Sequence, residues 1–170
     1  AARLFDHAGN MTEQFAALNC LLHIGAGDEA AARFYRQWAH DRLVIDKWFS
    51  LQIMQAAPER AAEVAETLTH HPDFTLRNPN RFRATLGALS GSPAGFHHAS
   101  GRGYRLLADM LIRLDPLNPQ TTARMCSAFE TWRRYDPVRQ GMIAAELDRI
   151  LATPNLSRDT TEMVGRIRGD

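Results

Sequence analysis

Seven histidines are the residues of this sequence that could most readily bind a metal, because neutral imidazole nitrogens are common zinc ligands. They stand at positions His7, His23, His40, His70, His71, His97 and His98. A zinc site on a helix needs two ligands on one face, as in H-E-x-x-H, and no pair of histidines here has that spacing. The two members of each adjacent pair point to different sides of a helix. We therefore predict no metal site in this chain, and we expect both adjacent pairs to be solvated or to cap helix ends.

Nucleophile and phosphate-binding motifs are missing from the sequence as well. It has no G-x-S-x-G and no C-x-x-C, and its GSPAG and GRG stretches lack the strand that precedes a phosphate loop. Asp46 and Lys47 interrupt the apolar stretch VIDKWF. A buried lysine can serve as a base, but an ion pair at a seam between helices is the more common arrangement. The residues thus predict no catalytic residue and no cofactor site in this chain.

Two arginines are the remaining candidates for binding. Arg83 follows Asn78-Pro79 and Arg124 follows Asn118-Pro119, and each arginine lies off the apolar stripe of its stretch. Asparagine is a good N-cap and proline is tolerated at the first helical position, so both pairs predict helix starts. Small residues stand about one helical turn after each arginine and leave room for its side chain: Gly87, Ser127 and Ala128. Two solvated arginines that cap neighbouring carbonyls are the alternative.

Helical periodicity, which must position these arginines, runs along the whole chain, and no stretch alternates like a half-buried strand. Apolar residues, caps and breakers predict about nine helices, at residues 10–24, 28–39, 42–55, 58–71, 78–89, 103–115, 118–132, 136–150 and from 157 onward. The Asn-Pro pair recurs after about 40 residues, which is typical of armadillo and HEAT repeats. We predict one all-α domain over residues 1–170, a superhelix of stacked antiparallel helix pairs.

The composition is that of a globular domain with almost no net charge. Because 20 Lys+Arg face 19 Asp+Glu, neither nucleic acid nor a membrane surface is an expected partner. No apolar run reaches the ~18 residues of a membrane span, and the opening AARLFDHAGN has no signal-peptide layout but looks like the tail of a helix. Cys20 and Cys126 lie in apolar helical stretches and are expected to be buried thiols rather than a disulfide, which indicates a reducing, cytoplasmic compartment.

Several separate segments resemble one known family. They are RLVIDKWFSLQ, HPDFTLRNPNRFRATLGAL, GYRLLADMLIRLDPLNPQTTARM, WRRYDPVRQ and LSRDTTEMVGRI. Their order and spacing resemble the C-terminal helical domain of bacterial aminopeptidase N, a gluzincin-type zinc metallo-aminopeptidase. The resemblance extends over nearly all of the chain and implies the terminal portion of that superhelical domain, without the upstream catalytic and β domains. The family's H-E-x-x-H and G-x-M-E-N motifs are not in this sequence, so the resemblance implies that zinc is bound by the parent's catalytic domain.

The resemblance also implies a role for this domain. In the family the superhelix closes over the catalytic domain and leaves a chamber with narrow openings, which admits short peptides and excludes folded proteins. Arginines at the positions of Arg83 and Arg124 face that chamber, where they could hold the carboxylate or carbonyls of the peptide beyond the cleaved bond. Arg81 is expected to be a structural partner of a repeat turn instead. The implied partners are the catalytic domain of the same chain and peptide substrates.

Two other interpretations stay open on sequence grounds. The same periodicities permit a stand-alone helical-repeat scaffold that binds another protein on its concave face and has no enzymatic role. A small helical enzyme with a histidine-based site is the third interpretation, and the missing metal spacing argues against it. Helices 11–24 and 28–39 are further expected to expose an apolar face that preceding repeats would cover, so the isolated chain is expected to self-associate.

Overall fold

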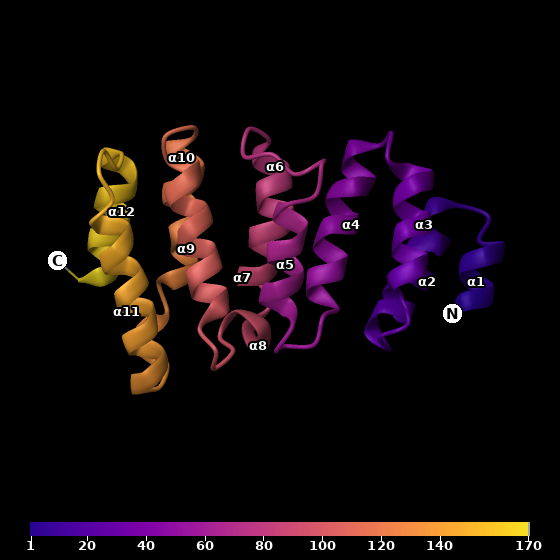
Figure 1. Cartoon of the computed structure of the whole chain (residues 1–170), viewed down its shortest axis with the longest axis horizontal. Helices are drawn as coiled ribbons and strands as arrows, with labels where there is room; N and C mark the ends of the chain where they lie inside the picture. The colour runs from indigo at the N-terminus through magenta and orange to yellow at the C-terminus, as the bar shows by residue number, and fades with distance from the viewer. Residues whose placement is uncertain (170) are drawn as a thin grey trace.

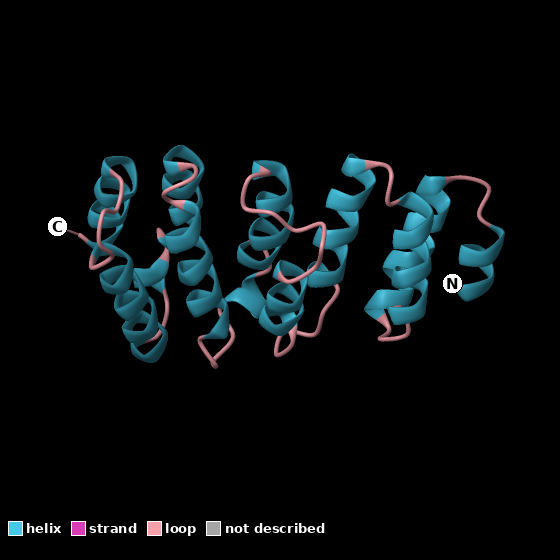
Figure 2. Cartoon of the chain, turned by 45° about the horizontal axis from the view of Figure 1, so that its top comes forward, coloured by secondary structure: helices cyan, strands magenta, loops and turns pink. Residues whose placement is uncertain are grey.

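The computed structural model describes residues 1–169, and over this range the chain is a row of antiparallel helices without a strand. The helices stand side by side along the long axis of the molecule, so the two ends of the chain lie at opposite ends of the row (Figure 1). Loops gather at the two edges of the row, and helices fill the space between them (Figure 2). The predicted all-α stack of helix pairs is confirmed.

Most of the helices fall into two layers. The first layer consists of α3 (Asp28–Trp38), α5 (Ala61–Thr69), α9 (Arg102–Leu114) and α11 (Pro137–Leu151). The second layer consists of α4 (Arg42–Met54), α6 (Pro79–Phe82) with its continuation into α7 (Ala88–Ser90), α10 (Pro119–Met125) and α12 (Arg158–Arg168). Each second-layer helix packs on the first-layer helix before it, and the resulting pairs stack on one another. The row begins with α1 (Ala2–His7) and α2 (Met11–His23), and the short α8 (Pro93–Phe96) links α7 to α9.

All four second-layer helices begin with a side-chain cap. The side chains of Asn78 and Asn118 accept hydrogen bonds from backbone N–H groups of their first turns, as predicted from the two Asn-Pro pairs. Asp41 does the same for α4, and Ser157 does the same for α12. Consecutive caps are about 40 residues apart. The repeat therefore occurs four times, although only two of its starts share a sequence motif.

The helix predicted at residues 118–132 is shorter than expected. Its α-helical part, α10, ends at Met125 and tightens into a 3-10 turn over Cys126–Phe129. Trp132 begins a separate 3-10 turn, and its indole Nε1 donates a hydrogen bond to the carbonyl oxygen of Ile167, 2.9 Å away at the end of α12. This tertiary bond holds the tryptophan away from the axis of α10, which local periodicity could not reveal.

A continuous apolar core lies between the two layers. Its largest completely buried side chains come from successive helix pairs and include Phe34, Phe49, Phe82, Phe96, Tyr104 and Phe129. The apolar residues at helical spacing in the helices predicted at residues 103–115 and 136–150 are buried as expected. Because burial of one such side chain contributes about 1.5–3 kcal/mol, this core is sufficient to hold the stack together without a crosslink.

A buried ion pair joins the first two repeats of the second layer. The carboxylate Oδ1 of Asp46 on α4 lies 2.5 Å from Nε of Arg81 on α6, and both side chains are largely buried. Arg81 also donates to the backbone carbonyl of Asp73 and lies over the ring of Phe49. Lys47, by contrast, is exposed. An ion pair is therefore present at this helix seam, but its cation is Arg81, and the expectation that Lys47 would be buried there was wrong. Arg81 has the structural role predicted for it.

The two cysteines differ in their surroundings. Cys126 is buried, as predicted, and burial raises the pKa of its thiol to about 12, which makes it unreactive near neutral pH. Cys20 is exposed on α2, so the prediction that it is buried was wrong. It lies between Leu18 and Leu21, which are buried, but points away from them because successive helical residues are about 100° apart. Neither cysteine forms a disulfide within residues 1–169.

Candidate functional site

Arg83 lies at the start of an irregular turn in the second layer. The segment predicted as one helix at residues 78–89 consists of α6, a π-helical turn over Arg83–Gly87, and α7. The Arg83 side chain is exposed, and its Nη2 donates to the side-chain oxygen of Asn80 at 2.7 Å. Its guanidinium keeps further donors free toward solvent, since no carboxylate within the described range pairs with it.

Two hydroxyl groups support the π-helical turn. A π turn shifts the backbone hydrogen-bonding pattern and leaves carbonyl groups in need of partners. The hydroxyl of Thr85, which is completely buried, donates to the carbonyl of Arg81 at 2.8 Å. The hydroxyl of Ser50 on α4 donates to the carbonyl of Ala84 at 2.7 Å. The turn beside Arg83 is thus fixed both by its own residues and by the neighbouring repeat.

Arg124 lies on the next second-layer helix, α10, and is also exposed. It forms no hydrogen bond or ion pair within residues 1–169. Its side chain borders an open depression between α10 and α12, together with Gln120, Ala123, Asp159, Glu162, Met163 and Arg166. Arg124 therefore has room to move and to meet a ligand, but acidic groups lie close to it.

The two arginines are both exposed and lie on neighbouring elements of the second layer. A methyl group placed on Gly87 would lie 4.0 Å from Cε of Met125, the residue after Arg124, so the two helices are in contact there. The small residue at position 87 thus makes space for Met125 as well as for Arg83. The positions are not equivalent, because Arg83 is the fifth residue after its cap and Arg124 is the sixth.

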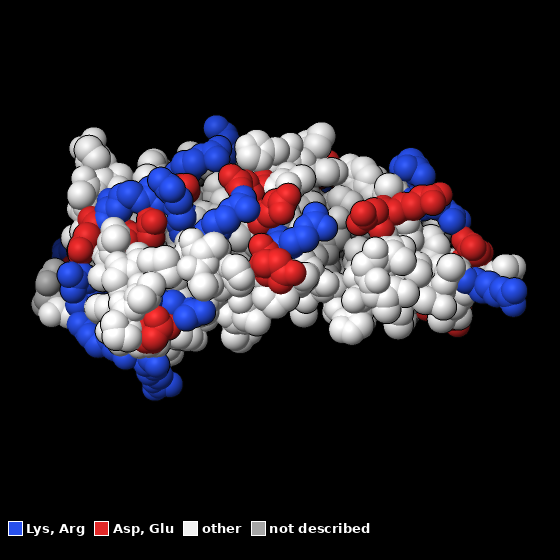
Figure 3. All heavy atoms as spheres, turned by 60° about the horizontal axis from the view of Figure 1, so that its bottom comes forward, with Lys and Arg blue, Asp and Glu red and all other residues white. Residues whose placement is uncertain are grey.

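Many exposed cations of the first layer, unlike these two arginines, form ion pairs. Several of its cations are paired with carboxylates, in the pairs Arg60–Glu63, Arg102–Glu66, Arg149–Asp109, Arg149–Glu146 and Arg139–Asp136. Others have no carboxylate partner within residues 1–169: Arg36, Arg105 and Arg113. Figure 3 shows positive and negative side chains lying next to one another over the middle of one face of the molecule. Part of the charge of the first layer is therefore neutralised, whereas Arg83 and Arg124 have no carboxylate partner in the described structure.

His71 is not solvated as expected but lies in an aromatic cluster. Its ring contacts those of Tyr35, Trp48 and Phe49 with centroid distances of 4.8–5.3 Å, and its Nδ1 accepts a hydrogen bond from the backbone N–H of Asp73. Burial lowers the pKa of His71. The α5–α6 loop folds back over α4, and this brings a residue from a predicted helix end into contact with the core.

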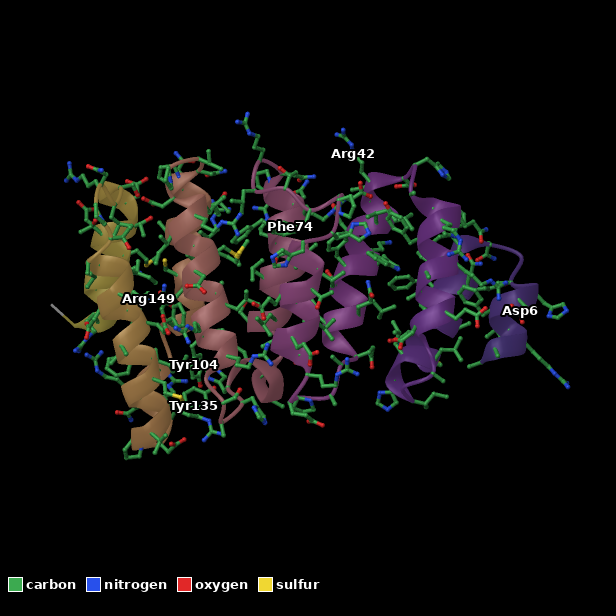
Figure 4. All side chains as sticks on the ribbon, in the orientation of Figure 1. Asp6, Arg42, Phe74, Tyr104, Tyr135 and Arg149 are labelled. Atoms are coloured by element: carbon green, nitrogen blue, oxygen red, sulfur yellow. The ribbon has the colours of Figure 1, made fainter. Side chains whose placement is uncertain are left out.

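His97 is also packed rather than solvated. It stacks on Tyr135 at 3.8 Å and shares a hydrogen bond with the hydroxyl of Tyr104. Figure 4 shows the two tyrosines close together beside α9 and α11. Burial lowers the pKa of His97 and raises the pKa of Tyr104 to about 12. Both His71 and His97 are accounted for by packing, whereas their neighbours His70 and His98 are exposed and half-buried, respectively.

No group of three histidine, cysteine, aspartate or glutamate side chains within residues 1–169 is arranged to hold a metal ion. The donor set for a zinc site is therefore not found in the described part of the chain. None of the helices described is long and apolar enough to cross a membrane. The geometry leaves the outer surface of the second layer, with its exposed arginines, as the candidate binding site.

Comparison with known proteins identifies related chains over this whole length. The family described as "Domain of unknown function (DUF3458_C) ARM repeats" matches residues 1–169. Aminopeptidase N of Caulobacter vibrioides is 39% identical over 99% of this chain, that of Haemophilus influenzae 37% over 94%, and that of Escherichia coli 38% over 96%. The chain covers only 19–20% of the length of these relatives. A crystal structure of Legionella pneumophila aminopeptidase A in complex with aspartic acid superposes with a TM-score of 0.90 at 35% identity, covering 98% of this chain and 20% of that one.

Proposed function

Because this chain belongs to the DUF3458_C family of ARM-repeat domains, we propose that it is the helical-repeat part of a zinc-dependent aminopeptidase that releases N-terminal residues from peptides. The observation that carries the proposal is the identity of 37–39% to three aminopeptidase N proteins over almost all of the chain. The expected resemblance to the C-terminal helical domain of bacterial aminopeptidase N is thereby confirmed. The activity, substrates and location of the whole protein, which we take to be cytoplasmic, are parts of the proposal.

The reaction itself is assigned to a different part of the protein. The described residues contain no three-residue donor set for zinc, so none of them fits the metal that the family implies. The packed histidines and the unreactive Cys126 offer no base or nucleophile in their place. We therefore assign the zinc and the catalytic residues to a catalytic domain of the same polypeptide, which is the partner that this domain covers.

Enclosure of the catalytic chamber is the role that suits the fold. Two layers of stacked helices form a wall that is about two helix diameters thick, and neighbouring repeats are tied together by the Asp46–Arg81 pair and the Ser50–Ala84 hydrogen bond. Such a wall keeps its shape while a substrate passes. It would admit a short peptide and exclude a folded protein, and it would limit bulk water around the reacting groups.

Arg83 and Arg124 are proposed to contact the peptide beyond the cleaved bond. Both are exposed on neighbouring elements of the second layer, and neither is held by a carboxylate within residues 1–169. A guanidinium can bind a peptide carboxylate through two parallel hydrogen bonds, or bind a backbone carbonyl through one. Each hydrogen bond to a charged group contributes about 1.5–3 kcal/mol, so one arginine would change affinity roughly ten- to hundredfold.

The test is made in the full-length protein that contains this chain. Arg83→Ala and Arg124→Ala are each expected to raise KM for peptides of four to six residues roughly ten- to hundredfold. KM for a single-residue amide, which does not reach beyond the cleaved bond, is expected to stay unchanged. Arg105→Ala, which removes an exposed cation from the first layer, is the matched control. Equal changes for peptide and amide would exclude the arginines from the binding site, and a full-length protein without peptidase activity would overturn the proposed function.

Self-association of the isolated chain stays a prediction. Leu4, on α1, and Ile24, at the end of α2, are 53% and 69% exposed, so apolar groups do reach the surface near this end of the row. Sedimentation of the chain over a range of concentrations measures it directly.

A further inference from the structure

Lys47 is the one lysine in a sequence that otherwise uses arginine for its basic residues. It lies on α4, most of whose circumference is buried. The exposed strip of this helix follows a helical spacing and contains Leu43, Lys47 and Met54. Lys47 forms no hydrogen bond or ion pair in the part of the chain that the structure describes. Its ammonium group is thus directed to solvent from the middle of a second-layer helix.

Two printed contacts connect Lys47 to the arginines of the candidate site. Ser50, one turn after Lys47 on α4, donates to the carbonyl of Ala84, the residue after Arg83. Gly87, one turn after Arg83, faces Met125, the residue after Arg124. Lys47, Arg83 and Arg124 therefore lie on three successive helices of one layer, each within about one turn of a contact with the next helix.

The carboxylates near Lys47 and Arg83 already have other partners. Asp46 is paired with Arg81. Asp73 accepts a hydrogen bond from the hydroxyl of Tyr35 at 2.7 Å. Asp115 is 2% exposed and accepts hydrogen bonds from α12. No acidic side chain among the described residues forms an ion pair with Lys47 or Arg83, whereas Arg102, Arg139 and Arg149 of the first layer are paired with carboxylates.

We infer that Lys47, Arg83 and Arg124 form a row of cations across the second layer that selects peptides carrying negative charge beyond the cleaved bond. The inference rests on the proposed function and names its substrate preference. Neighbouring helices pack about 8–10 Å apart, so the row is roughly 20 Å long. An extended peptide advances about 3.3 Å per residue, so the row is as long as about six residues.

The three positions are expected to differ in strength. Asp159 and Glu162 border the same depression as Arg124 and offset part of its charge. Lys47 has no such neighbour, and its compact ammonium group suits a single carboxylate from an aspartate or glutamate side chain or from the peptide C-terminus. The preference for acidic residues is therefore strongest for the part of the peptide that lies over α4.

The experiment uses the full-length protein and a set of leucyl-hexapeptide amides. In this set, alanine at each of positions 3 to 6 is replaced in turn by aspartate, asparagine or lysine. Wild-type protein is expected to cleave at least one aspartate peptide with kcat/KM about two- to fivefold above its asparagine counterpart, as is typical of an exposed ion pair. Lys47→Gln is expected to abolish that ratio at one position, Lys47→Arg to preserve it, and the control Arg105→Gln to leave it unchanged. Salt at about 1 M is expected to suppress the wild-type ratio.

Each outcome bears on a separate claim. Lys47→Gln that hydrolyses leucyl amide normally but keeps the full aspartate-over-asparagine ratio overturns the role of Lys47 and leaves the proposed function intact. A wild-type ratio of one at all four positions overturns the whole cation row in the same way. A full-length protein that cleaves none of the peptides overturns both the proposed function and this inference.

Discussion

Asp115 is the residue whose substitution tests most directly how the last two repeats are joined. It follows α9, is 2% exposed, and receives three hydrogen bonds from the start of α12. Its Oδ2 accepts from the backbone N–H of Ser157 at 2.7 Å, and its Oδ1 accepts from the hydroxyls of Ser157 and Thr160 at 2.6 and 2.5 Å. A buried carboxylate with no basic partner needs all of these donors, because an unsatisfied buried charge is costly.

The substitution Asp115→Asn removes part of this arrangement and keeps the shape of the side chain. The amide oxygen can still accept from both hydroxyls, but the amide nitrogen replaces Oδ2 and places a donor opposite the Ser157 N–H. One hydrogen bond to a charged group, at about 1.5–3 kcal/mol, is lost, and the other two lose their charge assistance. We expect a loss of about 2–4 kcal/mol in the free energy of unfolding, which corresponds to a decrease in Tm of roughly 5–12 °C for a chain of this size.

The assay is thermal and urea unfolding followed by circular dichroism, with hydrogen exchange of the α12 amides as a local readout. Asp159→Asn is the matched control, since it removes the same charge from the exposed first turn of α12 and is expected to cost only about 0.3–1 kcal/mol. Exchange is expected to increase in α12 before it increases in α4, because each repeat contacts only its neighbours. If Asp115→Asn lowers Tm by no more than Asp159→Asn does, the reasoning about the buried carboxylate is wrong.

Two further predictions concern the first two repeats. Arg81→Met is expected to destabilise the chain by about 3 kcal/mol because it leaves the largely buried Asp46 without its partner. The double variant Arg81→Met/Asp46→Leu is expected to recover most of that loss of stability, as measured by urea unfolding. No recovery would contradict the ion-pair argument. His71 has a lowered pKa in the folded chain, mainly through burial, so its contribution to stability is complete above the unfolded value of 6.5 and is lost as pH falls from there toward the folded value. The urea midpoint is therefore expected to decrease between about pH 7.5 and pH 5.5, and His71→Phe is expected to flatten that decrease; an unchanged slope would exclude His71 as its source.

The fold could be predicted from sequence because its signals are local. Caps, proline at the first helical position and apolar residues at helical spacing define each helix within its own residues. The π turn at Arg83–Gly87 and the early end of α10 could not be predicted this way. The first depends on a hydroxyl from α4, and the second depends on the bond from Trp132 to the end of α12. Both are tertiary interactions that override a local preference.

The site was harder to predict than the fold for a related reason. Exposure of Arg83 and Arg124 follows from their places off the apolar stripe, so both were found from the sequence. Lys47 was considered only as a buried base or as a member of an ion pair, because sequence gives no means of telling which cation would meet Asp46. The distant Arg81 took that position, and this left Lys47 exposed. The packed state of His71 likewise depends on a loop that folds back over α4.

The buried polar groups that join the repeats are different residues from the exposed cations of the proposed site, so stability and binding can be tested separately. Buried polar groups such as Asp46 and Asp115 join the repeats, and their loss is expected to be measured as instability. Lys47 and Arg124 have no hydrogen-bond or ion-pair partner within residues 1–169, and Arg83 has only Asn80. Surface substitutions of this kind usually change stability by less than about 0.5 kcal/mol. A change in peptide selectivity caused by these three residues must therefore arise from binding, because the wall that carries them is held together by other groups.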